Sequence, residues 1–206
     1  MTTRNDIAFL ARRVAWGLVP GELDKLETAG TSAYIDALLN PDGAGIAAEP
    51  SPWADFDYIE DQELRQEQGL EALSRWVTHL VETERPLENA MAWFWHDHFA
   101  VSFQVVQYLP LLIDHLDLIR DQGLGDFREL IRSVSTDSAM LIFLDGATST
   151  GDAPNENYGR ELLELYTLGI GNYTEDDVAA ASVALTGWVV RRRLRGEVEF
   201  VPSRHD

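Results

Sequence analysis

The sequence has 206 residues, of which 45% are hydrophobic and none is cysteine. This length and composition predict one folded domain over residues 1–206, and the absence of cysteine excludes a disulfide framework, a catalytic thiolate and sulfur ligands for a metal ion. Lys and Arg number 16 against 35 Asp and Glu, so the net charge of -19 disfavours nucleic acid and anionic membranes as partners.

Neither an export signal nor a membrane span is expected from the sequence. The N-terminal stretch MTTRNDIAFLARRVAWG contains Arg12 and Arg13 within its apolar pattern and lacks the uninterrupted apolar stretch and cleavage site of a signal peptide. No run approaches the roughly 18 consecutive apolar residues that a membrane-spanning helix needs. From these residues we expect a cytoplasmic protein without a membrane span.

Apolar residues recur at helical spacing along most of the chain, starting at Ile7. Residues 41–58 interrupt this pattern with three prolines and two glycines, which predicts a surface loop. A long helix is expected over residues 60–83, and Pro86 opens the next helix, LENAMAWFWHDHFAVS.

The second half of the chain predicts further helices and one hairpin. Asp126, Asp137 and Thr174 each stand where a side chain caps a following helix. At the C-terminal end, WVVRRRL and EVEFV flank the turn candidates Arg195 and Gly196, which predicts a β-hairpin. The expected fold is therefore mainly α, a single domain of about nine helices with a small C-terminal hairpin.

The stretch PNENYGRELLELYTLG, Pro154 to Gly169, concentrates polar side chains at the start of a predicted amphipathic helix. At about 100° per residue, Asn157, Arg160, Glu161 and Glu164 fall on one side of this helix. An ordinary helix with a solvated polar face explains most of this arrangement.

A functional interpretation of the same stretch rests on its oxygen-bearing side chains. Asp145, Asp152 and Asn155 precede the helix and are ligands of the kind that suit calcium or magnesium. They lead to a helix N-terminus, which favours an anion. Glu161 and Glu164 have the spacing of carboxylates in helical metal sites, although such a site needs partners from other helices.

The second candidate is WFWHDHF, Trp93 to Phe99, which contains His96 and His98. On a helix these histidines point about 200° apart, so they are not expected to share one ion. Because this helix is apolar nearly all round, we expect it to be buried, with one or both imidazoles hydrogen-bonded in the core. The alternative is that one histidine meets Asp97 or the carboxylates of the Pro154–Gly169 stretch, as a metal ligand or general base.

These motifs together resemble a known family. From about Phe9 to Trp188 the chain is similar to the bacterial family called domain of unknown function eighteen-hundred. The resemblance implies an α-helical protein, often exported and often encoded beside a secreted sulfatase-like protein as a potential partner. It brings no established reaction. The matching blocks are FLARRVAWG, FWHDHF, FRELIRSVSTDSAMLIFLD, PNENYGRELLELYTLG and YTEDDVAAASVALTGW.

Two departures from the family pattern accompany this resemblance. Family members commonly carry an export signal that this sequence lacks, and they usually continue beyond His205 and Asp206. The chain is therefore expected to be the N-terminal portion of a longer family domain. The positions that match the family signature are His96, His98, Asn155, Glu156, Asn157, Arg160, Glu161, Glu164, Thr186, Gly187 and Trp188.

The leading hypothesis is a divalent-metal-dependent hydrolase site, acting on an extracellular or envelope substrate, where the two helices meet. Its metal-ligating candidates are His96, His98, Asn157, Glu161 and Glu164.

The catalytic candidates of this hypothesis are Asp97, Arg160 and Glu161. Asp97 or one histidine acts as the base, and Arg160 stabilises developing negative charge. The alternative hypothesis is a non-catalytic helical scaffold or assembly partner of an exported or envelope complex, in which the same polar residues form a buried structural network.

Overall fold

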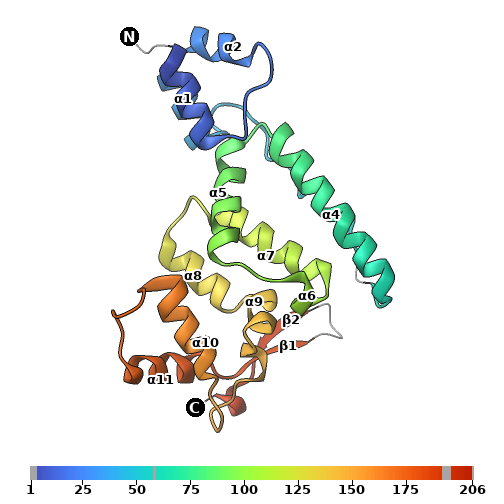
Figure 1. Ribbon diagram of the computed structural model, residues 1–206, viewed down its shortest axis with the longest axis vertical. Helices are drawn as coiled ribbons and strands as arrows, with labels where there is room; N and C mark the ends of the chain where they lie inside the picture. The colour runs from blue at the N-terminus through green and yellow to red at the C-terminus, as the bar shows by residue number, and fades with distance from the viewer. Residues whose placement is uncertain (1–3, 58, 192–195, 206) are drawn as a thin grey trace.

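The computed structural model describes residues 4–57, 59–191 and 196–205 and confirms the mainly α fold (Figure 1). Within these ranges the chain forms eleven α-helices, and none of them has the length and apolar content needed to cross a membrane. The helices are α1 (Arg4–Val14), α2 (Glu22–Ala29), α3 (Thr31–Leu39), α4 (Gln62–Glu82), α5 (Pro86–His98), α6 (Phe103–Val106), α7 (Leu109–Gln122), α8 (Phe127–Ser135), α9 (Ser138–Phe143), α10 (Glu156–Glu161) and α11 (Glu175–Ala184).

The predicted caps and hairpin are confirmed. Asp126 and Asp137 accept backbone N–H groups at the start of α8 and α9, and Thr174 forms a reciprocal capping box with Asp177 on α11. Strands β1 (Trp188–Arg191) and β2 (Glu197–Phe200) pair antiparallel, with Trp188 opposite Phe200. The predicted turn residue Arg195 lies outside the described residues.

The helices are arranged around more than one apolar core. Helices α1 to α3 form a lobe at the N-terminal end, and α5 leads from it into a body of α7 to α11 and the hairpin (Figure 1). The lobe packs around Ile7 and Tyr34, whereas the body packs around Phe99, Leu141 and Tyr158. Helix α4 runs along one side of this arrangement, away from the body (Figure 1).

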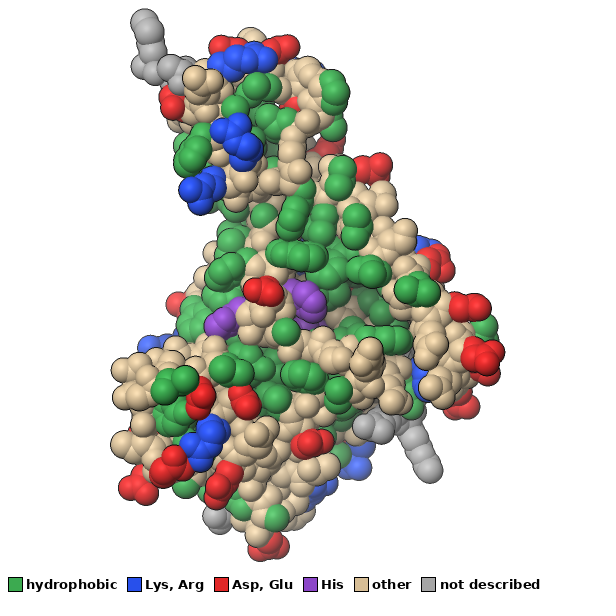
Figure 2. Space-filling model, viewed as in Figure 1, with side chains coloured by type: hydrophobic (Ala, Val, Ile, Leu, Met, Phe, Trp, Pro, Cys, Tyr) green, Lys and Arg blue, Asp and Glu red, His purple; other side chains and the backbone are tan. Residues whose placement is uncertain are grey.

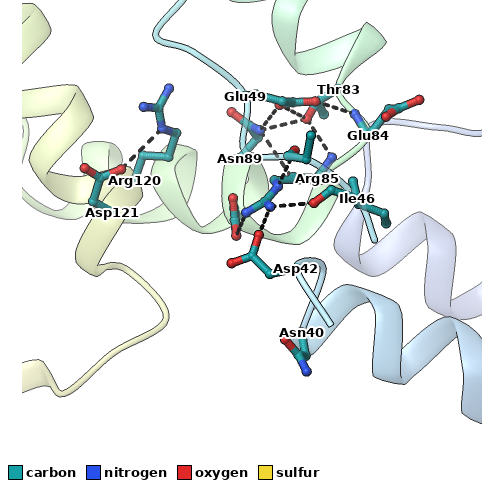
Figure 3. Close-up of polar contacts among 12 residues, drawn as sticks. Asn40, Asp42, Ile46, Glu49, Thr83, Glu84, Arg85, Asn89, Arg120 and Asp121 are labelled. Atoms are coloured by element: carbon teal, nitrogen blue, oxygen red, sulfur yellow. Dashed lines mark hydrogen bonds and ion pairs between the residues drawn. The ribbon is translucent and has the colours of Figure 1, made fainter. Parts of the chain in front are cut away.

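A polar cluster around Arg85 fixes the corner between α4 and α5 (Figure 3). The buried Arg85 guanidinium donates to the carbonyl oxygens of Ile46 and Ala47 at 2.6 and 2.9 Å and pairs with Asp42. Glu49 accepts from the Thr83 hydroxyl at 2.6 Å. Because these bonds tie the 40–61 loop to the corner, the loop helps to set the direction in which α4 leaves α5.

A second polar contact joins three helices inside the body. His115 of α7 is fully buried, with Nδ1 2.9 Å from Asp137 Oδ2 and Nε2 3.1 Å from the Phe99 carbonyl oxygen. The same Asp137 oxygen accepts the Met140 N–H at the start of α9. The C-terminal end of α5, the middle of α7 and the start of α9 therefore meet at one hydrogen-bonded point.

Replacing Asp137 with alanine should lower the free energy of unfolding by about 2–4 kcal/mol, because it removes a helix cap and leaves a buried nitrogen of His115 without its hydrogen-bond partner. Asp126→Ala is the matched control, since it removes the same kind of helix cap at an exposed position and should cost only about 1 kcal/mol. Urea unfolding of both variants measures the difference. Equal losses would show that Asp137 acts only as a cap.

Candidate functional site

A cavity of about 750 Å³ lies between α4 on one side and α5, α6 and α7 on the other. Figure 2 shows hydrophobic side chains gathered across the middle of this face, beside histidine side chains. We call this cavity the α4 groove. Its apolar lining includes Trp53, Leu73, Trp76, Phe103, Ile113 and Leu116.

The groove exists because α4 is apolar over more of its circumference than it buries. Ala72, Trp76 and Leu80 are buried against α7 and the 40–61 loop. Leu73 and Val77, the next positions around the helix, remain more than half exposed. Residues three or four apart share one helix face, so these apolar side chains form an uncovered stripe beside the buried one.

A row of indole rings crosses the region between the N-terminal lobe and the groove. Trp76 of α4 packs 6.0 Å from Trp53 in the loop and 5.1 Å from Trp93 of α5, measured between ring centroids. Trp93 in turn meets Trp16 edge-on at 5.3 Å. Such aromatic contacts add to the apolar burial and hold α4 at a defined distance from α5.

The prediction that α5 is buried all round is wrong. Trp93 is 41% exposed and Phe94 is 54% exposed. The reason is that α4 is directed away from the body (Figure 1), so Trp16 and Trp76 cover only part of this side of α5. The apolar pattern predicted the helix correctly, but the exposure of Trp93 and Phe94 depends on how the helices pack against one another.

His96 lines the groove, where its ring packs edge-on to Trp76 at 5.2 Å. Its Nδ1 atom is buried and has no hydrogen-bond partner within the described residues. The pKa of His96 is lowered to about 4, mainly by burial and to a smaller extent by the nearby His115, whereas Asp97 opposes the shift. The imidazole is therefore neutral at neutral pH, and of the two α5 histidines it is His98 that has a hydrogen-bond partner.

His98 contacts a different part of the molecule. Its Nε2 atom lies 3.1 Å from the carbonyl oxygen of Tyr166, and its ring packs edge-on to the Tyr166 ring at 6.1 Å. The two histidines of α5 therefore face different surroundings, as the helical spacing predicts. His98 does reach the segment that carries Glu161 and Glu164, although it does so through a backbone carbonyl.

The Pro154–Gly169 stretch is helical but not a regular α-helix. Helix α10 is followed directly by a π-helix, η2 (Leu162–Thr167), whose wider turn lets the N–H groups of Leu168 and Gly169 bond to the Leu163 carbonyl oxygen at 2.8 and 3.1 Å. The sequence predicted no such change. Single π-turns inside helices are frequent at functional sites.

The charged side chains of this stretch bond mainly to residues 173–175, which follow it in the chain. Arg160 forms two hydrogen bonds to Glu175 of α11, at 2.9 and 2.7 Å, and Tyr173 donates to Glu164. These contacts lie at the surface, whereas the scaffold hypothesis predicts a buried network. Glu161 is half-buried.

The amide residues of the stretch have separate roles. The Asn155 side chain donates to the Leu144 carbonyl oxygen at 2.7 Å and accepts the Tyr158 N–H at 3.1 Å, so it caps α10 and ties it to α9. Glu156 and Asn157 are exposed. The sequence could not separate the structural amide, Asn155, from the exposed amide two residues later.

The last signature positions hold the hairpin against the body. Thr186 is fully buried, and its hydroxyl lies 2.8 Å from Nδ1 of His205. Gly187 has φ +88°, and a Cβ atom there would lie 2.9 Å from the Phe200 ring, so only glycine fits. The Trp188 and Phe200 rings pack 5.1 Å apart. These positions support the fold.

The residues that the structure describes contain no group of three or more His, Asp or Glu side chains placed to hold a metal ion. His96 and His98 lie on different sides of α5, Asn157 is exposed, and Glu164 already accepts from Tyr173. The metal-ligating and catalytic roles given to these residues, and to Asp97, Arg160 and Glu161, remain predictions. Apart from His96, the side chains that line the groove were not singled out from the sequence as functional candidates.

Comparison with known proteins gives a match to a family model. A family model described as "Protein of unknown function (DUF1800)" covers residues 9–206. No curated protein and no solved structure matches the chain. The family match therefore relates the chain to other proteins but assigns no reaction to it.

Acid should destabilise the protein partly through His96. Its folded pKa of about 4 lies below the ordinary value of 6.5, so the unfolded chain binds more protons between these values. The stability that the neutral His96 contributes is complete above about pH 6.5 and is lost as the pH falls towards 4. This loss is at most about 3 kcal/mol. His96→Gln should thus lose less stability than the wild type between pH 7.5 and 4.5 in urea unfolding; parallel losses would contradict this assignment.

Proposed function

The chain belongs to the DUF1800 family, which confirms the resemblance read from the sequence but assigns no activity, and we propose that it is a binding protein whose α4 groove takes up a hydrocarbon chain. The single observation that carries this proposal is the groove itself. It is apolar, it is bordered by uncovered apolar side chains of α4, and it is held open by packed indole rings.

The size and lining of the groove support this proposal. Binding sites for small molecules usually have volumes of about 300–1,000 Å³, mostly apolar walls and a few polar groups. The α4 groove has about 750 Å³ and a mainly apolar wall. It also contains His96, whose lowered pKa marks an unusual environment of the kind that gathers at functional sites.

The length of the groove favours a chain over a compact ligand. Its lining follows α4 from Gln62 to Trp76, which corresponds to roughly 21 Å at 1.5 Å per helical residue. Val77 and Val81 extend the uncovered apolar stripe beyond this lining. Each buried methylene group stabilises binding by about 0.8 kcal/mol, so a chain of ten methylenes offers about 8 kcal/mol before the cost of ordering it.

Decan-1-ol should bind saturably to the protein and change the fluorescence of Trp53 and Trp76, because both rings line the groove. Leu73→Asp should weaken this binding at least about tenfold, since it places a charge against the hydrocarbon. Leu165→Asp is the matched control: Leu165 is 57% exposed and Leu73 is 53% exposed, but Leu165 lies on η2, outside the groove. Unsaturable binding, or equal weakening in both variants, would argue against the groove.

A metal-dependent hydrolase remains a second candidate, supported by the contact of His98 with the segment that carries Glu161 and Glu164. This candidate predicts stoichiometric divalent metal in the purified protein, measured by mass spectrometry, and its loss in Glu161→Ala. Glu156→Ala, at an exposed position of the same helix, should keep the metal. Wild-type protein that takes up no metal from a buffer containing divalent ions would remove this candidate.

A further inference from the structure

We propose that the α4 groove selects linear amphiphiles with a carboxylate head group, which Arg65 binds at the mouth of the groove. This inference rests on the proposed function and adds the chemistry of the head group. It is carried by the uneven distribution of polar side chains along the lining and by the surroundings of Arg65.

The lining is polar at one end and apolar at the other. Gln62, Arg65 and Gln66 belong to the first turns of α4, and Gln104 and Gln107 belong to the neighbouring α6 segment. The far end is formed by apolar residues of the loop, α4 and α7, including Trp53, Trp76, Ile113 and Leu116, together with the neutral His96 ring that packs against Trp76. A ligand that matches this wall has one polar end and one apolar end.

Arg65 gives the polar end of the groove a positive charge. Among the described residues that line the groove, it is the only Lys, Arg, Asp or Glu. Its guanidinium lies 5.0 Å from the centre of the Tyr108 ring, which holds it in place through a cation–π contact. No ion pair joins it to a carboxylate in the described part of the chain, whereas Arg75, Arg85 and Arg160 each have one.

The geometry of a guanidinium favours a carboxylate over other head groups. Arginine presents its N–H donors in a planar fork that bonds both oxygens of a carboxylate. The amide N–H groups of Gln62 and Gln66 add donors beside it. A cationic head group at the same place meets a like charge, and a hydroxyl gains no charge-assisted bond.

The negative charge of the whole protein does not cancel this local preference. Exposed charges farther away than about 8 Å are largely screened at physiological ionic strength. The groove wall contains no Asp or Glu among its described residues, so Arg65 is the one charged Lys, Arg, Asp or Glu side chain that this wall presents to a ligand. Net charge therefore slows the approach of an anion more than it weakens the bound complex.

The test compares three ligands with the same chain, namely decanoate, decan-1-ol and decyltrimethylammonium, by competition against a neutral fluorescent dye bound to the full protein at pH 8. The wild type should bind decanoate at least about tenfold more tightly than decyltrimethylammonium, as expected for a charge-assisted hydrogen bond. Arg65→Gln should abolish this preference while the affinity for decan-1-ol changes less than about twofold. Arg65→Lys should retain part of the preference.

Arg128→Gln is the matched control, because Arg128 is an exposed arginine of α8 without an ion pair in the described residues. It should leave all three affinities unchanged. Equal binding of decanoate and decyltrimethylammonium by the wild type would overturn the head-group assignment and leave the groove proposal standing. Failure of decan-1-ol to bind would instead overturn the groove proposal itself. An Arg65→Lys variant that folds but prefers the cation would also overturn the assignment.

Discussion

The position of α5 depends on one buried contact, the bridge that His115 makes from α7. Its ring nitrogens lie 2.9 Å from the Asp137 carboxylate and 3.1 Å from the Phe99 carbonyl oxygen, so this one side chain joins α7 to the end of α5 and the start of α9. Because the ring is fully buried, losing either partner would leave a ring nitrogen without a hydrogen bond inside the core. Because the end of α5 is held there, its preceding turn directs His96 to the groove and His98 to the π-helix.

Local sequence patterns were sufficient for most of the fold. Helical periodicity, the capping side chains and the Arg195–Gly196 turn signal all act within a few residues, and the helices, caps and strand pairing that they predict are present. The direction of α4 could not be read in this way, because Arg85 sets it through carbonyl groups 38 and 39 residues earlier. The π-turn at Leu162–Thr167 was missed for a related reason: its apolar residues fit either helix type.

The sequence could predict the geometry of the candidate site only where that geometry is set within a single helix. A helix turns by about 100° per residue, so His96 and His98 are predicted to point in opposite directions. The structure confirms this, since His96 lines the groove and His98 contacts the π-helix. Their partners belong to other elements, so the contacts of His96 with Trp76 and of His98 with the Tyr166 backbone could not be predicted from the helix alone. In the sequence, Arg65 is not distinguished from other surface cations. Its place at the polar end of the groove is visible only in the structure. One signal was available, since the apolar positions of α4 span more of its circumference than one packed face needs.

The open groove follows from how α4 is supported at two points. Near its middle, Trp76 packs on Trp53, and these rings fill the angle between α4 and α7. Nearer its start, Gly69 leaves room for Phe103, whose ring lies 3.2 Å from where a Cβ atom would stand. Since α4 rests on side chains at both places, it cannot close onto α7 without displacing them from contacts that bury large apolar areas. The uncovered surface between the supports is therefore built into the packing, and a ligand can bury it without rearranging the helices.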